Sequence, residues 1–279
     1  MKAQIVLATH NPRPDLLERQ LRSLIAQTER DWQCLVLDDA SRHRAAVARA
    51  LVDPRFTLLS PQNHLGPYRA FETLLTRVDD VPVFLCDQDD HWHPEKLARM
   101  LTVSGTTFSA MRVVDERGRP VRARFLPPPP DLTPAGLLLM NCVSGTALKI
   151  SPQVRTAALP FPAPTLRGWH DQWLAAVAAR LGELTYLDEA LVDYTKHASQ
   201  VVGDGLRAVT ARRLRRFLQR PDLRSRTDWV RVSAHRLLEL PGPADPELEA
   251  IAAGHFRQVL RHHSIPRIRA ALLLAGRWG

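Results

Sequence analysis

Hydrophobic and polar positions in the first third of the chain predict a series of buried strands that each end in polar residues. The first run, Gln4 to His10, is mostly apolar before it ends in a threonine and a histidine, as expected of a strand covered on both faces. Three further runs of this kind lie at Cys34 to Asp39, Phe56 to Ser60 and Val81 to Asp87. Each run therefore brings polar side chains to the carboxyl end of a predicted strand.

Helical patterns fill the segments between these runs. Asp15 is predicted to cap a helix, with Glu18 three residues later and leucines recurring on one face. A short helix is predicted at Ala45 to Leu51, and Gly66 opens another. Alternating strands and helices predict an α/β fold with a doubly wound, mostly parallel sheet flanked by helices. Ligands of such sheets bind outside the carboxyl ends of the strands.

The alternation becomes less regular after residue 105. A hairpin is predicted within Thr106 to Val121 and an extended loop at Pro127 to Pro130. A strand at Val143 to Ile150 precedes a Pro-rich stretch that reaches Pro164. A helix at His170 to Leu181 and a strand at Leu184 to Asp193 then complete the first predicted domain.

The net charge of +9 is concentrated in the last quarter of the chain. Residues 1–204 carry 23 basic and 23 acidic side chains, whereas residues 205–279 carry 15 arginines, no lysine and 6 acids. A length of 279 residues suits one large domain or one domain with an appendage. We therefore divide the chain into a first domain at 1–204 and an arginine-rich, helical C-terminal appendage at 205–279.

The arginines from Arg207 to Arg226 alternate with apolar residues at helical spacing. Such a helix has a cationic face that binds anionic lipid headgroups in some proteins and is simply solvated in others, with the apolar face packed on a domain. Both interpretations stay open. The segment lacks a nucleic-acid recognition motif and the interleaved aromatic residues of single-strand binders, so nucleic acid is not an expected partner.

The remaining composition favours a cytoplasmic protein, either soluble or attached to the inner face of the cell membrane. The three cysteines, Cys34, Cys86 and Cys142, are far apart in apolar surroundings and do not predict a disulfide framework or a zinc site. The first ten residues are too short an apolar run for a signal peptide. No segment reaches the roughly 18 apolar residues of a membrane span.

The strongest chemical signal is the segment Asp87-Gln88-Asp89-Asp90, which directly follows an apolar strand. Three carboxylates within four residues repel one another unless a cation or hydrogen-bond donors compensate them. A divalent cation that also bridges phosphate oxygens would relieve this repulsion and stabilise a departing diphosphate. Taken alone, the segment is more typical of a solvated acidic turn that caps the next helix.

Its surroundings favour the metal-binding interpretation. The stretch Cys86 to Leu97, with the pattern Cys-Asp-Gln-Asp-Asp-x-Trp-x-Pro-x-Lys-Leu, resembles the aspartate motif of family-2 glycosyltransferases of the GT-A fold, in particular a rhamnosyltransferase-like branch. The resemblance covers roughly residues 4 to 203. Its other segments, in order along the chain, are Ile5 to Asn11, Leu21 to Thr28, Leu35 to Ser41, Trp169 to Trp173, Tyr186 to Glu189 and Tyr194 to His197.

This resemblance implies an inverting transfer of a hexosyl or deoxyhexosyl group from a nucleotide-diphosphate sugar, with UDP or dTDP as the expected nucleotide. Residues 1–204 would form the nucleotide-sugar-binding and catalytic domain. The acceptor would be a carbohydrate or a lipid-linked sugar in bacterial surface polysaccharide or glycolipid assembly. The resemblance also implies Mn²⁺ or Mg²⁺ as cofactor.

The resemblance assigns roles to individual residues around the donor. Thr9 and Asp39 would hold the nucleotide base and Asp87 the ribose, which is compatible with carboxylates that accept from a pyrimidine N–H and from hydroxyls. Asp38 either contacts the donor or caps the next turn. Asp89 is the expected metal ligand, whereas Asp90 either contacts the donor or caps the following helix.

The acceptor side has its own candidates. Asp171 would be the general base, since an inverting transfer needs a carboxylate within hydrogen-bond reach of the acceptor hydroxyl; the alternative is that it only caps a helix. His170 would help to position the substrate, and Trp169 would offer an apolar face to a sugar or base; the alternative is that Trp169 only packs in the core. His197 would contact the metal or the diphosphate, a role that favours a transition metal such as manganese over magnesium.

Two departures from the family pattern stand out. His10 occupies a position where tyrosine is common, and Ser199-Gln200 replace a frequent asparagine. A non-catalytic binding module with the same fold is the main alternative function, and a nucleic-acid-binding protein that uses the basic tail is a second. Retention of Asp87, Asp89, Asp171 and His197 together favours an enzyme.

Overall fold

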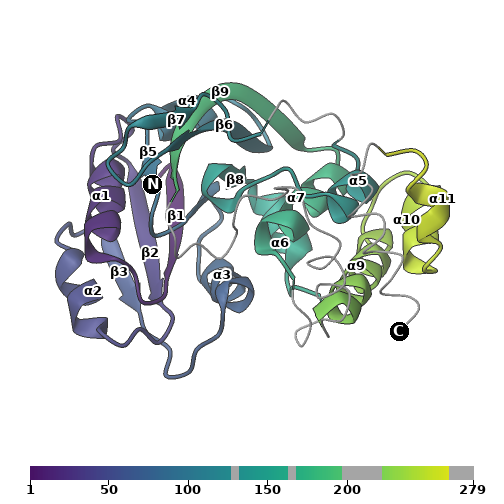
Figure 1. Cartoon of the computed structure of the whole chain (residues 1–279), viewed down its shortest axis with the longest axis horizontal. Coiled ribbons are helices and arrows are strands. Elements are labelled where there is room, and N and C mark those ends of the chain that lie inside the picture. Colours follow the sequence, from purple (N-terminus) through teal and green to yellow (C-terminus); the bar gives the residue numbers. More distant parts are fainter. Residues whose placement is uncertain (127–131, 163–167, 197–221, 264–279) are drawn as a thin grey trace, which may run out of the picture.

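The computed structural model describes residues 1–126, 132–162, 168–196 and 222–263 (Figure 1). Within these residues, nine strands form one sheet with the order β3-β2-β1-β4-β8-β6-β9-β5, and β7 pairs with β6. Helices cover both faces of this mostly parallel sheet. The fold class predicted from the strand and helix patterns is confirmed.

The first four strands along the chain form the parallel half of the sheet. They are β1 (Ala3–Thr9), β2 (Trp32–Asp38), β3 (Phe56–Leu59) and β4 (Val83–Cys86). In the register of β1 with β2, Thr9 lies opposite Asp38. Because parallel strands end at the same edge, the polar residues that follow these strands meet there.

The second half of the sheet is mixed. Its strands are β5 (His91–Trp92), β6 (Thr106–Val114), β7 (Pro120–Arg122), β8 (Leu148–Ile150) and β9 (Leu184–Thr195). β8 runs antiparallel to β4 and β6, whereas β6 and β9 are parallel. The short β5 pairs antiparallel with β9 and brings the segment after the acidic turn against the last strand.

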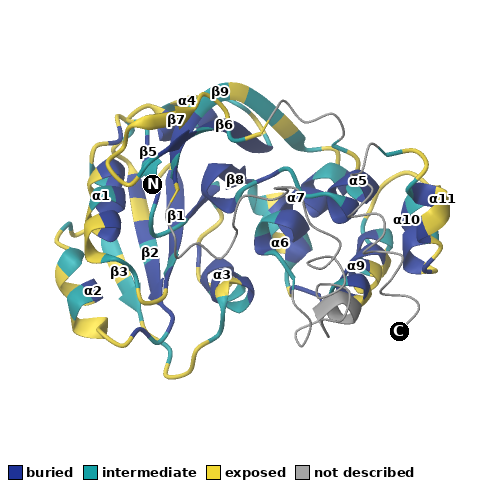
Figure 2. Cartoon of the chain, in the orientation of Figure 1, coloured by how far each residue is buried: buried dark blue, intermediate teal, exposed yellow. Residues whose placement is uncertain are grey.

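Alternate residues of β1 supply the two hydrophobic cores on either face of the sheet. Ile5 and Leu7 pack in one core with α1 (Pro14–Ile25), α2 (Arg44–Ala50) and α4 (Lys96–Leu101). Val6 points into the other core, which is shared with α3, α5, α6 and α7. Figure 2 shows β1 almost entirely in the dark blue of buried residues. A strand buried on both faces explains why the run from Gln4 is apolar without alternation.

The second core continues without interruption into the C-terminal helices. The helices of this core are α3 (Pro67–Leu75), α5 (Pro134–Leu139), α6 (Pro152–Ala158), α7 (His170–Arg180), α9 (Asp222–Leu238), α10 (Pro246–Ala252) and α11 (Phe256–Val259). Trp229 of α9 is fully buried in it. Arg180, at the end of α7, donates hydrogen bonds to the carbonyls of Leu237 and Leu240 at 3.2 and 3.3 Å, and so satisfies acceptors at the end of α9.

Several local predictions were wrong. Asp15 does not cap α1: the helix begins at Pro14, and Asp15 pairs with Arg13 within its first turn. The strand predicted from Val143 is confined to β8, because residues 145–147 form a 3₁₀ helix. The Pro-rich stretch contains the helix α6, since its first proline occupies the first helical turn, where no N–H is needed.

Three predicted features lie outside the described residues. They are the extended loop at 127–130, most of the arginine-rich segment and the proposed domain boundary at residue 204. Among the helices that the structure describes, none combines the length and the apolar character needed to cross a membrane.

Candidate functional site

The parallel strand ends bring Thr9 and Asp38 into direct contact. The Thr9 hydroxyl donates to Asp38 Oδ1 at 3.3 Å, and both side chains are buried. The Arg44 guanidinium lies 3.7 Å from Asp38 Oδ2 and balances its charge. Asp38 caps no helix, because α2 begins after His43. The structure thus places Thr9 and Asp38 behind the strand edge, with Asp38 held by two side chains.

Asp39 organises the loop that leads into α3. Its carboxylate accepts hydrogen bonds from the backbone N–H groups of Leu65 and Gly66 at 2.6 and 2.8 Å and is 3% exposed. Gly66 precedes α3 with a φ of 76°, a conformation that favours glycine. The glycine that sequence patterns identify only as a helix start therefore lets the loop close over the carboxylate.

The acidic turn after β4 holds three carboxylates in different surroundings. Asp87 is half-buried, and its pKa is raised to about 7 by burial and by the negative charges of Asp89 and Asp171. Asp89 is also half-buried. Asp90 is fully buried, and burial followed by the charges of Asp89 and Asp87 raises its pKa well above the usual range. The turn is thus a place where negative charge is crowded and poorly solvated.

Asp90 has a structural contact that its sequence position does not reveal. Its Oδ1 accepts the backbone N–H of Thr195 at 3.1 Å, which ties the turn to the end of β9. The following helix, α4, begins after Glu95 without a side-chain cap. The alternative that Asp90 caps this helix is therefore wrong.

Lys96 is a fully buried lysine near this turn, and the sequence pattern did not single it out. Its ammonium donates to the Thr146 carbonyl at 2.7 Å and lies 3.1 Å from the centre of the Trp92 ring. Burial lowers the pKa of Lys96 well below its usual value, while Cys86, Asp90 and Asp87 raise it. A lysine two residues after the proline of the motif was the available signal, but spacing alone does not show that the side chain turns inward.

Asp171 lies in the first turn of α7 and close to the acidic turn. Its pKa is raised to about 6 by burial, against hydrogen bonds from the backbone of Gln172 and Gly145 and the side chain of Asn141. The charge of Asp171 contributes to the raised pKa of Asp87, so the fold brings these two carboxylates, 84 positions apart in the sequence, near one another. A carboxylate with a pKa near neutrality is suited to accept a proton. The helix itself starts after Trp169, which is half-buried and makes no side-chain cap.

The C-terminal helix α9 approaches the same place. Burial lowers the pKa of Arg226, and the nearby Asp171 carboxylate opposes that shift. Trp229, one turn further on, donates from Nε1 to the Tyr68 hydroxyl at 3.1 Å, and that hydroxyl donates to the Pro162 carbonyl at 2.9 Å. Gly168, three residues before Asp171, also lies directly against the Trp229 ring, where an added Cβ would clash with Nε1.

His170 is held in the core as a neutral ring. It stacks on Phe71 with ring centroids 3.9 Å apart, and burial lowers its pKa to about 3. Neither ring nitrogen has a hydrogen-bond partner among the described residues. His170 therefore lies beside Asp171 but faces the core, where it supports the start of α7. His197, the predicted metal or diphosphate contact, lies outside the described residues.

We predict that Gly145→Ala destabilises the protein by about 1 to 3 kcal/mol, as overpacking of a core does. A Cβ at position 145 would lie 2.6 Å from His170 Nε2, and the ring has little room to move because Phe71 stacks on it. Urea unfolding measures the loss. Ser144→Ala is the matched control, and the cost of the alanine at 145 should shrink in a His170→Ala background. Equal costs in both backgrounds would show that the ring does not explain the glycine.

The chain is similar in sequence to known glycosyltransferases. Residues 4–113 match the model of the family described as Glycosyl transferase family 2. The chain is also 25% identical, over 213 residues, to an uncharacterized glycosyltransferase from Nostoc sp.. That match covers 71% of this chain and 66% of the relative. The matched family segment contains the strand ends with Thr9 and Asp39 and the acidic turn.

Solved structures share the fold of the whole chain. S. aureus TarS 1-349 in complex with UDP-GlcNAc has a TM-score of 0.68 at 18% identity, with 96% of this chain and 74% of that chain covered. The mannosyltransferase PcManGT from Pyrobaculum calidifontis, in complex with GDP-Man and Mn²⁺, has a TM-score of 0.54 at 19% identity. That alignment covers 99% of this chain and 79% of that chain. The fold is therefore of the GT-A glycosyltransferase type.

Proposed function

We propose that this chain is an inverting glycosyltransferase that transfers a sugar from a nucleotide-diphosphate sugar to an acceptor hydroxyl. The observation that carries the proposal is the proximity of Asp171 to the acidic turn, which places a weakly basic carboxylate beside a crowded cluster of carboxylates. The match of residues 4–113 to Glycosyl transferase family 2 supports the same reaction class. A rhamnosyltransferase-like branch stays a prediction from the motif residues.

The donor half of the site suits a nucleotide diphosphate and a divalent cation. Asp39 lies at the strand edge where ligands of such sheets bind, and we propose that it and Thr9 hold the base and that Asp87 holds the ribose. The carboxylates of the acidic turn fit a hard cation, because a metal removes the repulsion that raises the pKa of Asp87 and Asp90. Asp89 is the proposed ligand of Mn²⁺ or Mg²⁺, joined by His197. When bound, the cation stabilises the negative charge of the leaving nucleotide diphosphate.

The chemical step is a single displacement at the anomeric carbon. The acceptor oxygen forms a bond to that carbon as the bond to the diphosphate oxygen breaks, and the diphosphate leaves with the bonding electron pair. Asp171 takes the proton of the acceptor hydroxyl. The burial of Asp171 raises its pKa to about 6, which makes it a stronger base than an exposed aspartate while it is still ionised near neutral pH.

UDP-sugars and GDP-sugars are the first donors to test, because two structural neighbours contain such donors. The sequence resemblance adds dTDP-sugars. Those neighbours were solved with UDP-GlcNAc and with GDP-Man. We propose a carbohydrate or lipid-linked acceptor in surface polysaccharide or glycolipid assembly, and contact of the arginine-rich segment with an anionic membrane. The chain spans 66% of the Nostoc relative and 74% of TarS 1-349. The activity of those whole proteins is therefore only a proposal for this chain.

We predict that one nucleotide diphosphate raises the melting temperature only in the presence of Mn²⁺ or Mg²⁺. At a ligand concentration of 100 Kd the stabilisation is about 2.7 kcal/mol, which corresponds to roughly 5 to 10 °C for a chain of this size. Differential scanning fluorimetry with UDP, dTDP and GDP, each with and without metal, measures the shift. The corresponding monophosphates are the controls, since they lack the second phosphate that bridges to the metal. If no nucleotide diphosphate shifts the transition, the proposed donor class is wrong.

A further inference from the structure

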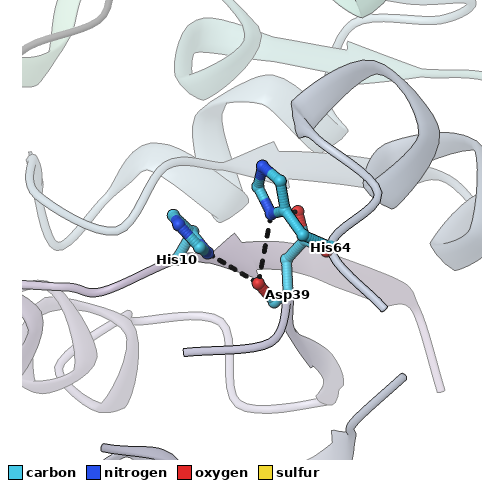
Figure 3. A group of neighbouring side chains, drawn as sticks. All are labelled: His10, Asp39 and His64. Carbon is cyan, nitrogen blue, oxygen red and sulfur yellow. Dashed lines mark hydrogen bonds and ion pairs between the residues drawn. The ribbon is translucent and has the colours of Figure 1, made fainter. Parts of the chain in front are cut away.

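A second cluster of metal-binding side chains lies beside the acidic turn, at the ends of β1 and β2. His10 follows β1, Asp39 follows β2, and His64 belongs to the loop before α3 (Figure 3). One ligand atom from each of the three residues lies within 4.8 Å of the others. Figure 3 shows that both imidazole rings are directed toward Asp39.

Direct contacts join both histidines to Asp39. His64 Nδ1 lies 2.9 Å from Asp39 Oδ2, and His10 Nδ1 lies 2.6 Å from the Asp39 backbone carbonyl oxygen. Ligand atoms of a tetrahedral zinc site lie roughly 3.3 Å apart, since each bond is about 2.0 to 2.2 Å long. The separations of up to 4.8 Å in the cluster must therefore shorten when an ion binds, which requires the exposed rings of His10 and His64 to rotate.

Hydrogen bonds from neighbouring groups reach two of the three ligands. The backbone N–H groups of Leu65 and Gly66 hold the Asp39 carboxylate, and the Asn11 amide contacts His10 Nε2 at 2.8 Å. Asn11 in turn accepts the N–H of Arg42 at 2.9 Å. Hydrogen bonds of this kind orient histidine and carboxylate ligands around protein metal ions. The Asp39 carboxylate is therefore held in place before any ion binds, whereas His10 must release either the Asp39 carbonyl from Nδ1 or Asn11 from Nε2 to coordinate an ion.

We propose that His10, Asp39 and His64 form a transition-metal site of the zinc class. Two imidazoles and one carboxylate match the ligand preferences of Zn²⁺ and Co²⁺, whereas Mg²⁺ prefers oxygen ligands alone. The site shares no ligand with the acidic turn, although the two adjoin: the His10 backbone N–H donates to Gln88 Oε1 of that turn at 2.9 Å. Its consequence rests on the proposed function: because Asp39 would also hold the nucleotide base, a metal ion here and a nucleotide exclude each other.

The site is tested by titrating the metal-free Asp89→Asn variant with Co²⁺ and Zn²⁺. This variant is used because it lacks the proposed metal ligand at the acidic turn. We expect one Co²⁺ per chain, with the visible absorption of a tetrahedral complex, and displacement of that ion by Zn²⁺. His10→Asn and His64→Asn should each weaken Co²⁺ binding by at least about 100-fold, which exceeds the usual effect of losing an outer-shell partner. His43→Asn, at an exposed histidine of the neighbouring loop, should leave it unchanged.

A wild-type-like Co²⁺ affinity in the His10→Asn, His64→Asn double variant would overturn the proposal, as would the absence of a tetrahedral spectrum. The melting temperature of each variant checks that the fold is retained. Uridine, thymidine and guanosine then serve as competitors, because nucleosides lack the diphosphate that chelates metals in solution. Failure of all three nucleosides to bind the metal-free protein counts against the proposed base site, whereas the metal site is decided by the titrations alone.

Discussion

Replacing Asp171 by asparagine is expected to lower kcat by about 10² to 10⁴-fold, the range that a general base contributes. The asparagine retains an oxygen that accepts the Gln172 N–H, so the start of α7 should keep its conformation. What it loses is the ability to take a proton. Donor binding should change little, because the side chain acts on the acceptor. Initial rates of transfer and nucleotide titrations under the same conditions separate the two effects.

The pH profile provides an independent check on the same residue. The pKa of Asp171 is raised to about 6 by burial, so kcat/KM should be constant above pH 7 and fall about tenfold per pH unit well below 6, as the base becomes protonated. The residual activity of Asp171→Asn should lack this acidic limb. Asp228→Asn, at an exposed position of α9, is the matched control. An unchanged kcat in Asp171→Asn would remove Asp171 from the mechanism.

The parallel half of the fold could be predicted because its signals are local. A strand such as β1 is apolar on both faces, and its polar end at Thr9 follows from the same run of residues. Strand ends of one parallel sheet meet at one edge, so the proximity of Thr9, Asp38 and the acidic turn follows from the fold class. Short elements escaped prediction for the opposite reason: β5 has two residues and exists through its pairing with β9.

The site details depend on contacts between distant segments, which the sequence pattern does not encode. Asp90 was interpreted as a donor contact or a helix cap, but its carboxylate accepts the N–H of Thr195, 105 residues away. From the sequence alone, Lys96 is expected to be an ordinary solvated lysine. In the structure, its position in α4 directs the side chain inward over the Trp92 ring. His64 carries no motif, and its position beside Asp39 depends on how the loop before α3 closes. In each case tertiary packing decided what residue type alone left open.

Asp89→Asn is expected to abolish metal-dependent transfer, with a loss in kcat of about 10³-fold or more. A bound cation contributes several kcal/mol to stabilising the charge on a leaving group, and each 1.36 kcal/mol is tenfold in rate. The substitution is nearly isosteric and removes one negative charge from a turn where burial and repulsion already raise the pKa of Asp87 and Asp90. Relief of this repulsion offsets the contact that the carboxylate makes, so the loss of stability in the variant should be small. Mn²⁺ binding, followed by electron paramagnetic resonance, measures the loss of the ion directly.

The combination of lost activity and retained stability is what distinguishes a metal ligand from a structural carboxylate. A carboxylate that served only the fold would stabilise it, so its removal would lower the melting temperature. A ligand held in a repulsive cluster stabilises only the metal-bound state, and the variant should differ from the parent chiefly when Mn²⁺ is present. Asp188→Asn, at an exposed aspartate paired with Arg124, is the control for charge alone. Equal Mn²⁺ affinity in parent and Asp89→Asn would place the ion elsewhere.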